Sequence, residues 1–115
     1  MPLLTVQIDA IAEQLLARKT AENDFTISVE AGEHGRLTVG RIMLVARSSG
    51  RVAWFWTITG PAAPEAGIGL VGEADDLDGA KAALRAAFDR LLHWAAMARD
   101  GELGWHVGAE RIGGG

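Results

Sequence analysis

The stretch that most constrains this fold is RLTVGRIMLVARSSGRVAWFWTITGP, residues 36–61. It holds two runs rich in β-branched and aromatic residues, which favour strands. Ser48-Ser49-Gly50 separates them, and a glycine can adopt the positive φ that a tight turn requires. We therefore predict a β-hairpin.

The length of the turn decides which side chains share a face. A three-residue turn places Ile42 opposite Trp56 and leaves Arg41 on the other face. A two-residue turn places Met43 opposite Trp56 and buries Arg41. We favour the three-residue turn, because a buried arginine without a partner is costly.

Apolar residues change parity within the first strand of the hairpin. Leu37 and Val39 occupy odd positions, whereas Ile42 and Leu44 occupy even ones. Gly40 lies at the change. We predict a β-bulge there, because one extra residue re-aims a strand.

Residues 76–99 have the pattern of a long amphipathic helix. Asp76 or Asp75 can accept a hydrogen bond from the first turn, and Gly101 can provide a left-handed end. The apolar residues form a stripe about 120° wide on a helical projection. They are Ala80, Leu84, Ala87, Phe88, Leu91, Trp94, Ala95 and Ala98.

Trp54 and Trp56 project to the same side of their strand, because side chains alternate along a strand. We expect them to pack in the core beneath helix 76–99, where their large apolar area stabilises the fold. The alternative is a stacking platform for bases, sugars or a proline-rich peptide.

Residues 3–20 fit a helix, because Leu4, Ile8, Ile11 and Leu15 recur at helical spacing. The rival interpretation is a strand over residues 4–8, followed by a shorter helix. We favour the longer helix.

The predicted fold class is α+β, with an N-terminal helix, an antiparallel sheet of three to four strands, and a long C-terminal helix packed on one sheet face. Trp105 and Val107 suggest a short strand or anchor near the end. Residues 1–110 are expected to form one domain and residues 111–115 a disordered glycine-rich tail. The predicted strands are 24–31, 36–47, 51–59 and 67–72, the last of them at an edge or at a close approach of another backbone.

Composition excludes several classes of protein. A chain of 115 residues without cysteine corresponds to one domain with no disulfide or thiolate site. No apolar run approaches the ~20 residues of a membrane span, and no basic segment precedes the first apolar residues. We expect a cytoplasmic protein that does not bind membranes. The net charge of −4 argues against bulk electrostatic binding to nucleic acid.

Charge is unevenly distributed along the chain. No acidic residue lies between Gly35 and Pro64, and four arginines do, at positions 36, 41, 47 and 51. The candidate interaction face is the side of the hairpin opposite the tryptophans, with Arg41, Met43, Arg47, Arg51 and Phe55. A second copy or another protein would cover such a face, or the first helix would, or single-stranded nucleic acid would use its arginines and aromatic ring.

No residues are predicted to be catalytic, cofactor-binding or metal-binding. His34, His93 and His106 fall in a loop, on a polar helix face and in the tail, which is not the spacing of a metal site. The three serines lack the context of a nucleophile. We therefore predict a non-enzymatic interaction domain, with a homodimer or a protein partner.

The segment GEADDLDGAK, residues 72–81, together with Asp100-Gly101-Glu102, resembles the strand-to-helix step of HicB-type antitoxins. The resemblance covers about a quarter of the chain and implies a small sheet-plus-helix fold. The function of those antitoxins is not carried over to this chain. The alternative function, a nucleic-acid-associated or antitoxin-like regulator, would use Arg41, Arg47 and Arg51 of the hairpin. The strand VAWFWTITGP before such a helix also resembles small proteobacterial proteins without a known function. The predicted leading helix, the arginine-bearing hairpin and the lack of a recognisable DNA-binding extension depart from the antitoxin pattern.

Overall fold

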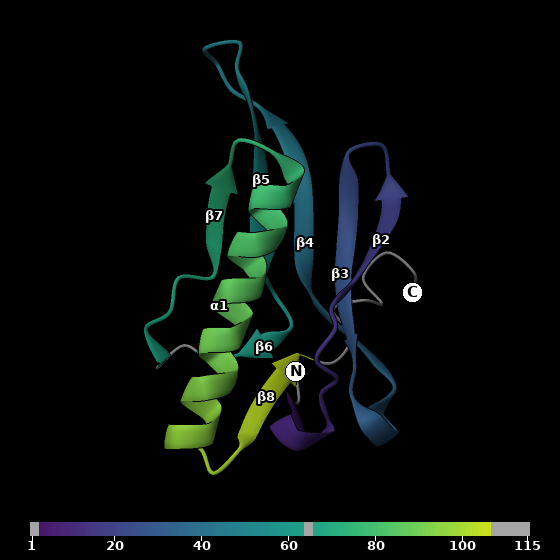
Figure 1. Cartoon of the computed structure of the whole chain (residues 1–115), viewed down its shortest axis with the longest axis vertical. Helices are drawn as coiled ribbons and strands as arrows, with labels where there is room; N and C mark the ends of the chain where they lie inside the picture. Colours follow the sequence, from purple (N-terminus) through teal and green to yellow (C-terminus); the bar gives the residue numbers. More distant parts are fainter. Residues whose placement is uncertain (1–2, 64–65, 107–115) are drawn as a thin grey trace.

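The structure is a computed structural model that describes residues 3–63 and 66–106. These residues form two antiparallel sheets and one α-helix (Figure 1). The larger sheet has the order β2-β3-β4-β5-β7 and the smaller one β1-β8-β6. The strands are β1 Leu3–Gln7, β2 Leu16–Ala21, β3 Asp24–Glu30, β4 Arg36–Ala46, β5 Val52–Ile58, β6 Pro61–Ala62, β7 Val71–Ala74 and β8 Glu102–His106. The helices are α1 Leu77–Ala98 and the 3-10 turns η1 Ile8–Ala10 and η2 Gly32–His34.

The predicted N-terminal helix is wrong. Residues 3–7 form β1 and residues 16–21 form β2, with only a 3-10 turn at Ile8–Ala10. β1 pairs with β8, so that Val6 lies opposite Leu103 in a fully buried position. The partner strand lies almost a whole chain length away, and its pairing overrides the local helical spacing, as tertiary context often does.

The prediction of one sheet of three to four strands is also wrong, because the structure has sheets of five and three strands. β3, β4 and β5 lie close to the predicted bounds, whereas β2, β6 and the pairing of β1 with β8 in a separate sheet were not predicted. The fourth predicted strand, 67–72, begins later, at Val71, and forms the edge of the larger sheet. Trp105 lies in β8 as expected. Val107 and the predicted tail 111–115 lie outside the described residues.

The hairpin has the predicted register. Ile42 lies opposite Trp56 and Leu44 opposite Trp54. The bulge is confirmed too, because Ile27 pairs with Gly40 whereas Ser28 pairs with Thr38. One extra residue in β4 therefore switches the buried positions from odd to even. A Cβ at Gly40 would overlap the carbonyl oxygen of Thr57, which explains the glycine.

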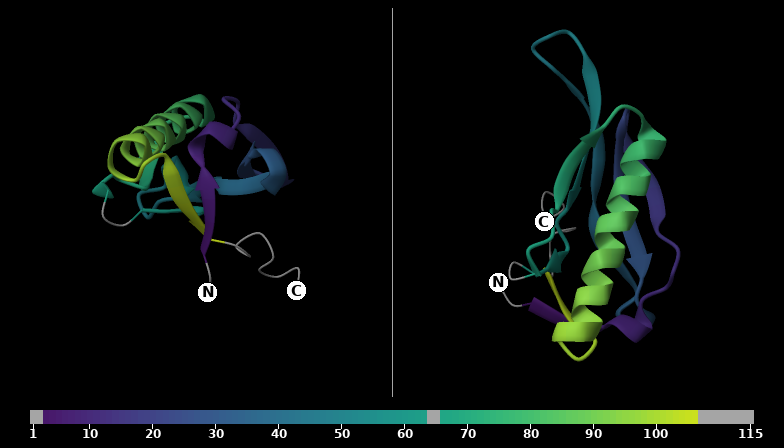
Figure 2. Two further views of the ribbon diagram at one scale, coloured as in Figure 1. Left: turned by 90° about the horizontal axis from the view of Figure 1, so that it is seen from below. Right: turned by 60° about the vertical axis from the view of Figure 1, so that its left-hand side comes forward.

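α1 begins and ends as its sequence predicts. The Asp76 side chain accepts a hydrogen bond from the Gly79 amide at 2.7 Å, and Gly101 has a φ of +80° after the last turn. The buried face comprises Ala80, Leu84, Ala87, Phe88, Leu91 and Ala95. We call the face of the larger sheet toward α1 the inner face (Figure 2). No helix of the described residues is long and apolar enough to cross a membrane.

The tryptophans belong to the core to different degrees. Trp56 is buried and Trp54 is half-buried against the core. Gly72 leaves room for the Trp56 ring, since a Cβ there would lie 2.7 Å from it. Trp105 is fully buried, packs edge-on against Phe88 at 6.1 Å, and donates from Nε1 to the Thr38 carbonyl oxygen at 2.7 Å. This hydrogen bond joins the two sheets.

Candidate interaction surface

One row of four residues crosses the larger sheet on the face away from α1. Asp24 of β3 lies opposite Met43 of β4, Met43 lies opposite Phe55 of β5, and Phe55 lies opposite Glu73 of β7. Neighbouring strands are about 4.8 Å apart, so the row is about 14 Å long. An apolar pair therefore occupies its centre and a carboxylate stands at each end.

A second pair extends the apolar part of this face toward the hairpin turn. Val45 lies opposite Ala53, and both are half-buried. Met43, Val45 and Phe55 do not belong to the hydrophobic core or to the residues packed against it. No other element of residues 3–63 and 66–106 lies over this part of the sheet (Figure 2). We call Asp24, Arg41, Met43, Val45, Ala53, Phe55 and Glu73 the open sheet face.

Arg41 neutralises the carboxylate at one end of the row. Its Nε donates to Asp24 Oδ1 at 2.8 Å, and its Nη2 donates to the other carboxylate oxygen. The hydrogen bond from Arg41 holds the pKa of Asp24 below its ordinary value, although partial burial acts in the opposite direction. The Asp24 side chain is only 16% exposed, compared with 50% for Arg41.

Arg47 neutralises the carboxylate at the other end. It lies just beyond β4, and its Nη2 forms an ion pair with Glu73 Oε1. Arg51 follows the turn and lines a polar hollow of about 430 Å³ together with Arg47, Glu73 and Asp75. The structure shows no ion-pair partner for Arg51 within its described part.

The structure thus brings the five predicted site residues to one side of the hairpin. Arg41, Met43 and Phe55 lie on the open sheet face, Arg47 reaches it through Glu73, and Arg51 stands at the adjoining turn.

The two carboxylates of the row, Asp24 and Glu73, are not among the predicted site residues. The arginine-rich window is consequently less basic than its sequence suggests, because Arg36 also pairs, with Glu30 at 3.0 Å. No signal in the sequence alone assigned these partners.

The described residues contain no cluster of three or more side chains suited to hold a metal ion. His93 lies on the exposed side of α1 and His106 at the end of β8, in the smaller sheet. Comparison with family models, with curated proteins and with solved structures gives no match for this chain. The function is therefore inferred from its own residues.

Proposed function

We propose that this protein is a non-enzymatic interaction domain that associates with a second copy of itself through the open sheet face. The observation that carries the proposal is the row from Asp24 to Glu73. Its apolar centre is half-buried, no other element of the described chain covers it, and an apolar patch left uncovered on a sheet face marks an interface.

The second copy is favoured over other partners because the row is nearly symmetric. Asp24 with Arg41 at one end matches Glu73 with Arg47 at the other. A two-fold axis through the centre of the row would place apolar residues on apolar residues and ion pairs beside ion pairs. An isologous interface requires this self-complementarity, and stacked sheets approach to about 10 Å.

The same ion pairs weigh against the alternative function, a regulator that binds nucleic acid. A phosphate would have to compete with Asp24 for Arg41 and with Glu73 for Arg47. Affinity for nucleic acid grows with the number of cations available to neutralise phosphates. Only Arg51, among the arginines of the predicted face, lacks an ion-pair partner in the described chain.

Sedimentation velocity over a wide concentration range tests this function. The wild-type sedimentation coefficient is expected to rise with concentration. Phe55→Glu places two carboxylates at the interface and should keep the protein monomeric. Met97→Glu is the matched control, because Met97 is 76% exposed on α1. A wild type that stays monomeric at every concentration contradicts the proposal.

A second experiment addresses the alternative. Single-stranded DNA and RNA oligonucleotides are added at low salt to the wild type and to a variant with Arg41→Ala and Arg47→Ala. No binding is expected. Salt-dependent binding that the double substitution weakens would favour the regulator over the self-associating domain.

A further inference from the structure

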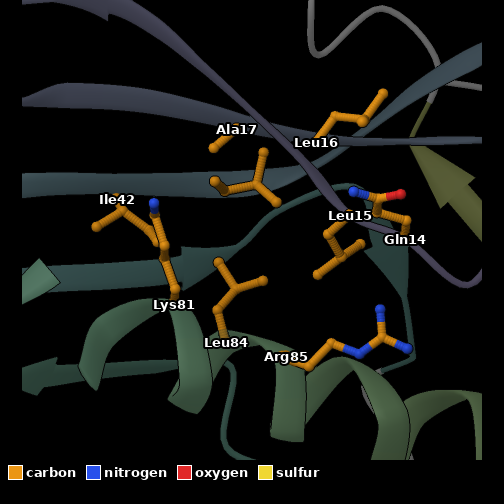
Figure 3. Close-up of a pocket in the computed structure, with 9 residues that line it drawn as sticks. Gln14, Leu15, Leu16, Ala17, Ile42, Lys81, Leu84 and Arg85 are labelled. Atoms are coloured by element: carbon orange, nitrogen blue, oxygen red, sulfur yellow. The ribbon is translucent and has the colours of Figure 1, made fainter. Parts of the chain in front are cut away.

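A single helix is too narrow to cover the inner face of the five-stranded sheet. A helix with its side chains is about 10–12 Å across, whereas five strands span about 19 Å. α1 packs mainly on β5 and β7, toward one edge of the sheet. The inner face of β2 and β3 therefore depends on the segment before β2, and a cavity remains between this segment and α1 (Figure 3).

This cavity has a volume of about 340 Å³, at the lower end of the range for small-molecule sites. Its lining is mostly apolar, and its polar groups are few. Leu84 projects into it from α1 between Lys81 and Arg85, and Gln14 lies on the opposite side (Figure 3). The apolar residues of the lining are Leu15, Leu16, Ala17, Ile27, Ile42 and Leu84.

Two cations, Lys81 and Arg85, lie on either side of Leu84 at the cavity (Figure 3). Lys81 and Arg85 are one helical turn apart, a spacing at which like charges repel. Arg85 donates to the backbone carbonyl oxygen of Glu13 and forms an ion pair with Asp89 at 3.1 Å. Lys81 makes no ion pair in the part of the chain that the structure describes. One uncompensated positive charge therefore adjoins an apolar cavity.

We infer that this cavity binds a small amphiphilic anion, a carboxylate on a short aliphatic chain. The chain occupies the space between Leu84 and the inner face, where burial of its apolar surface drives binding. The carboxylate lies against the Lys81 ammonium group, since an ionised acceptor and donor form a stronger hydrogen bond than neutral groups do. The Arg85 guanidinium is held beside the site by Glu13 and is neutralised by Asp89.

The probe for this site is octanoate, added to protein labelled with ¹³C at the isoleucine methyl groups. At concentrations up to about 10 mM, well above a millimolar Kd, the Ile27 and Ile42 signals should shift and saturate. Ile8, Ile58 and Ile68, which do not line the cavity, should not move. Acetate lacks the chain and should shift none of them. The inference is overturned if Ile27 and Ile42 show no saturable shift, or if all five of these isoleucines shift equally.

Two substitutions test the Lys81 charge and the cavity volume separately. Lys81→Met should weaken octanoate binding about two- to fivefold, in line with one exposed ion pair, and leave 1-octanol binding unchanged. Lys19→Met is the control, because Lys19 is the only other lysine of the chain and pairs with Glu22 at 3.2 Å. Ala17→Phe fills the cavity from β2 and should abolish binding of both probes. Equal affinities of the two lysine variants, or unchanged binding by a folded Ala17→Phe protein, overturn the inference.

Discussion

Met43 and Phe55 face each other across β4 and β5 on the sheet face opposite α1. They are the apolar centre of a row whose outer members, Asp24 and Glu73, each pair with an arginine that lies on or just beyond β4. Arg41 and Arg47, two of the four arginines of this hairpin, therefore form ion pairs within the face itself. The face that results is apolar in the middle and balanced in charge at both ends, which suits contact with another copy.

The Arg41–Asp24 pair should make stability depend on pH in the acidic range. The pKa of Asp24 is lowered in the folded protein, whereas an unfolded aspartate titrates near 3.9. The stabilising contribution is thus present above about pH 5 and is lost as pH falls through the folded pKa. Denaturant titrations from about pH 5 to pH 2 should show a smaller loss of unfolding free energy for Asp24→Asn than for the wild type.

Arg41→Met provides the control for this prediction, since it removes the other member of the pair. It should reduce the acid-induced loss as Asp24→Asn does, and the double variant should show no additional reduction. Identical pH dependence in the wild type and Asp24→Asn would show that Arg41 does not stabilise the Asp24 carboxylate in the folded state.

The bulge in β4 should tolerate no side chain at position 40. Gly40→Ala is expected to lower the free energy of unfolding by at least about 2 kcal/mol, because its Cβ would overlap the Thr57 carbonyl oxygen. Gly69→Ala is the matched control, since nothing lies within 4 Å of a Cβ there and its φ is not positive. It should change stability by less than about 1 kcal/mol. Equal effects of the two substitutions in urea unfolding would contradict the register of the hairpin.

Trp105 should contribute more to stability than Trp54, although the two side chains are identical. Trp105→Phe removes the donor to the partly buried Thr38 carbonyl oxygen and leaves a cavity, which together should cost about 2–4 kcal/mol. Trp54 is half-buried, and its indole makes no hydrogen bond within the described chain, so Trp54→Phe should cost less than about 1.5 kcal/mol. Thermal unfolding of both variants measures the difference. A larger loss of stability for Trp54→Phe than for Trp105→Phe would contradict the role of the Trp105–Thr38 hydrogen bond in joining the two sheets.

The sequence predicts the elements whose pattern is local. The hairpin register depends on Ser48–Gly50, and α1 depends on Asp76 and a continuous apolar stripe, so both were predicted with the correct neighbours. The pairing of β1 with β8 depends on residues about a hundred positions apart. Leu4 and Val6 alternate as a strand requires, but they also fit a helix until β8 is present to pair with them.

The open sheet face also combines features that the local sequence predicts with features that depend on distant strands. Its side of the hairpin follows from the alternation of Arg41, Met43 and Phe55. The pairing of Asp24 with Met43 depends on the bulge in β4, because without the extra residue Asp24 would lie opposite Ile42 instead. Glu73 reaches the row only because β7 pairs with β5. Neither carboxylate could be assigned until the strand order and the register were known.

The most direct test of the central proposal is the ¹³C-methyl NMR signal of Met43 in a dilution series. Met43 lies on the open sheet face, and Met97 lies exposed on α1, so Met97 is an internal control in the same sample. Association through the open sheet face predicts that the Met43 signal shifts with protein concentration along the same curve as the sedimentation coefficient. The Met97 signal should stay constant. A Met43 signal that does not change with concentration, or a shift confined to Met97, would contradict the proposed interface.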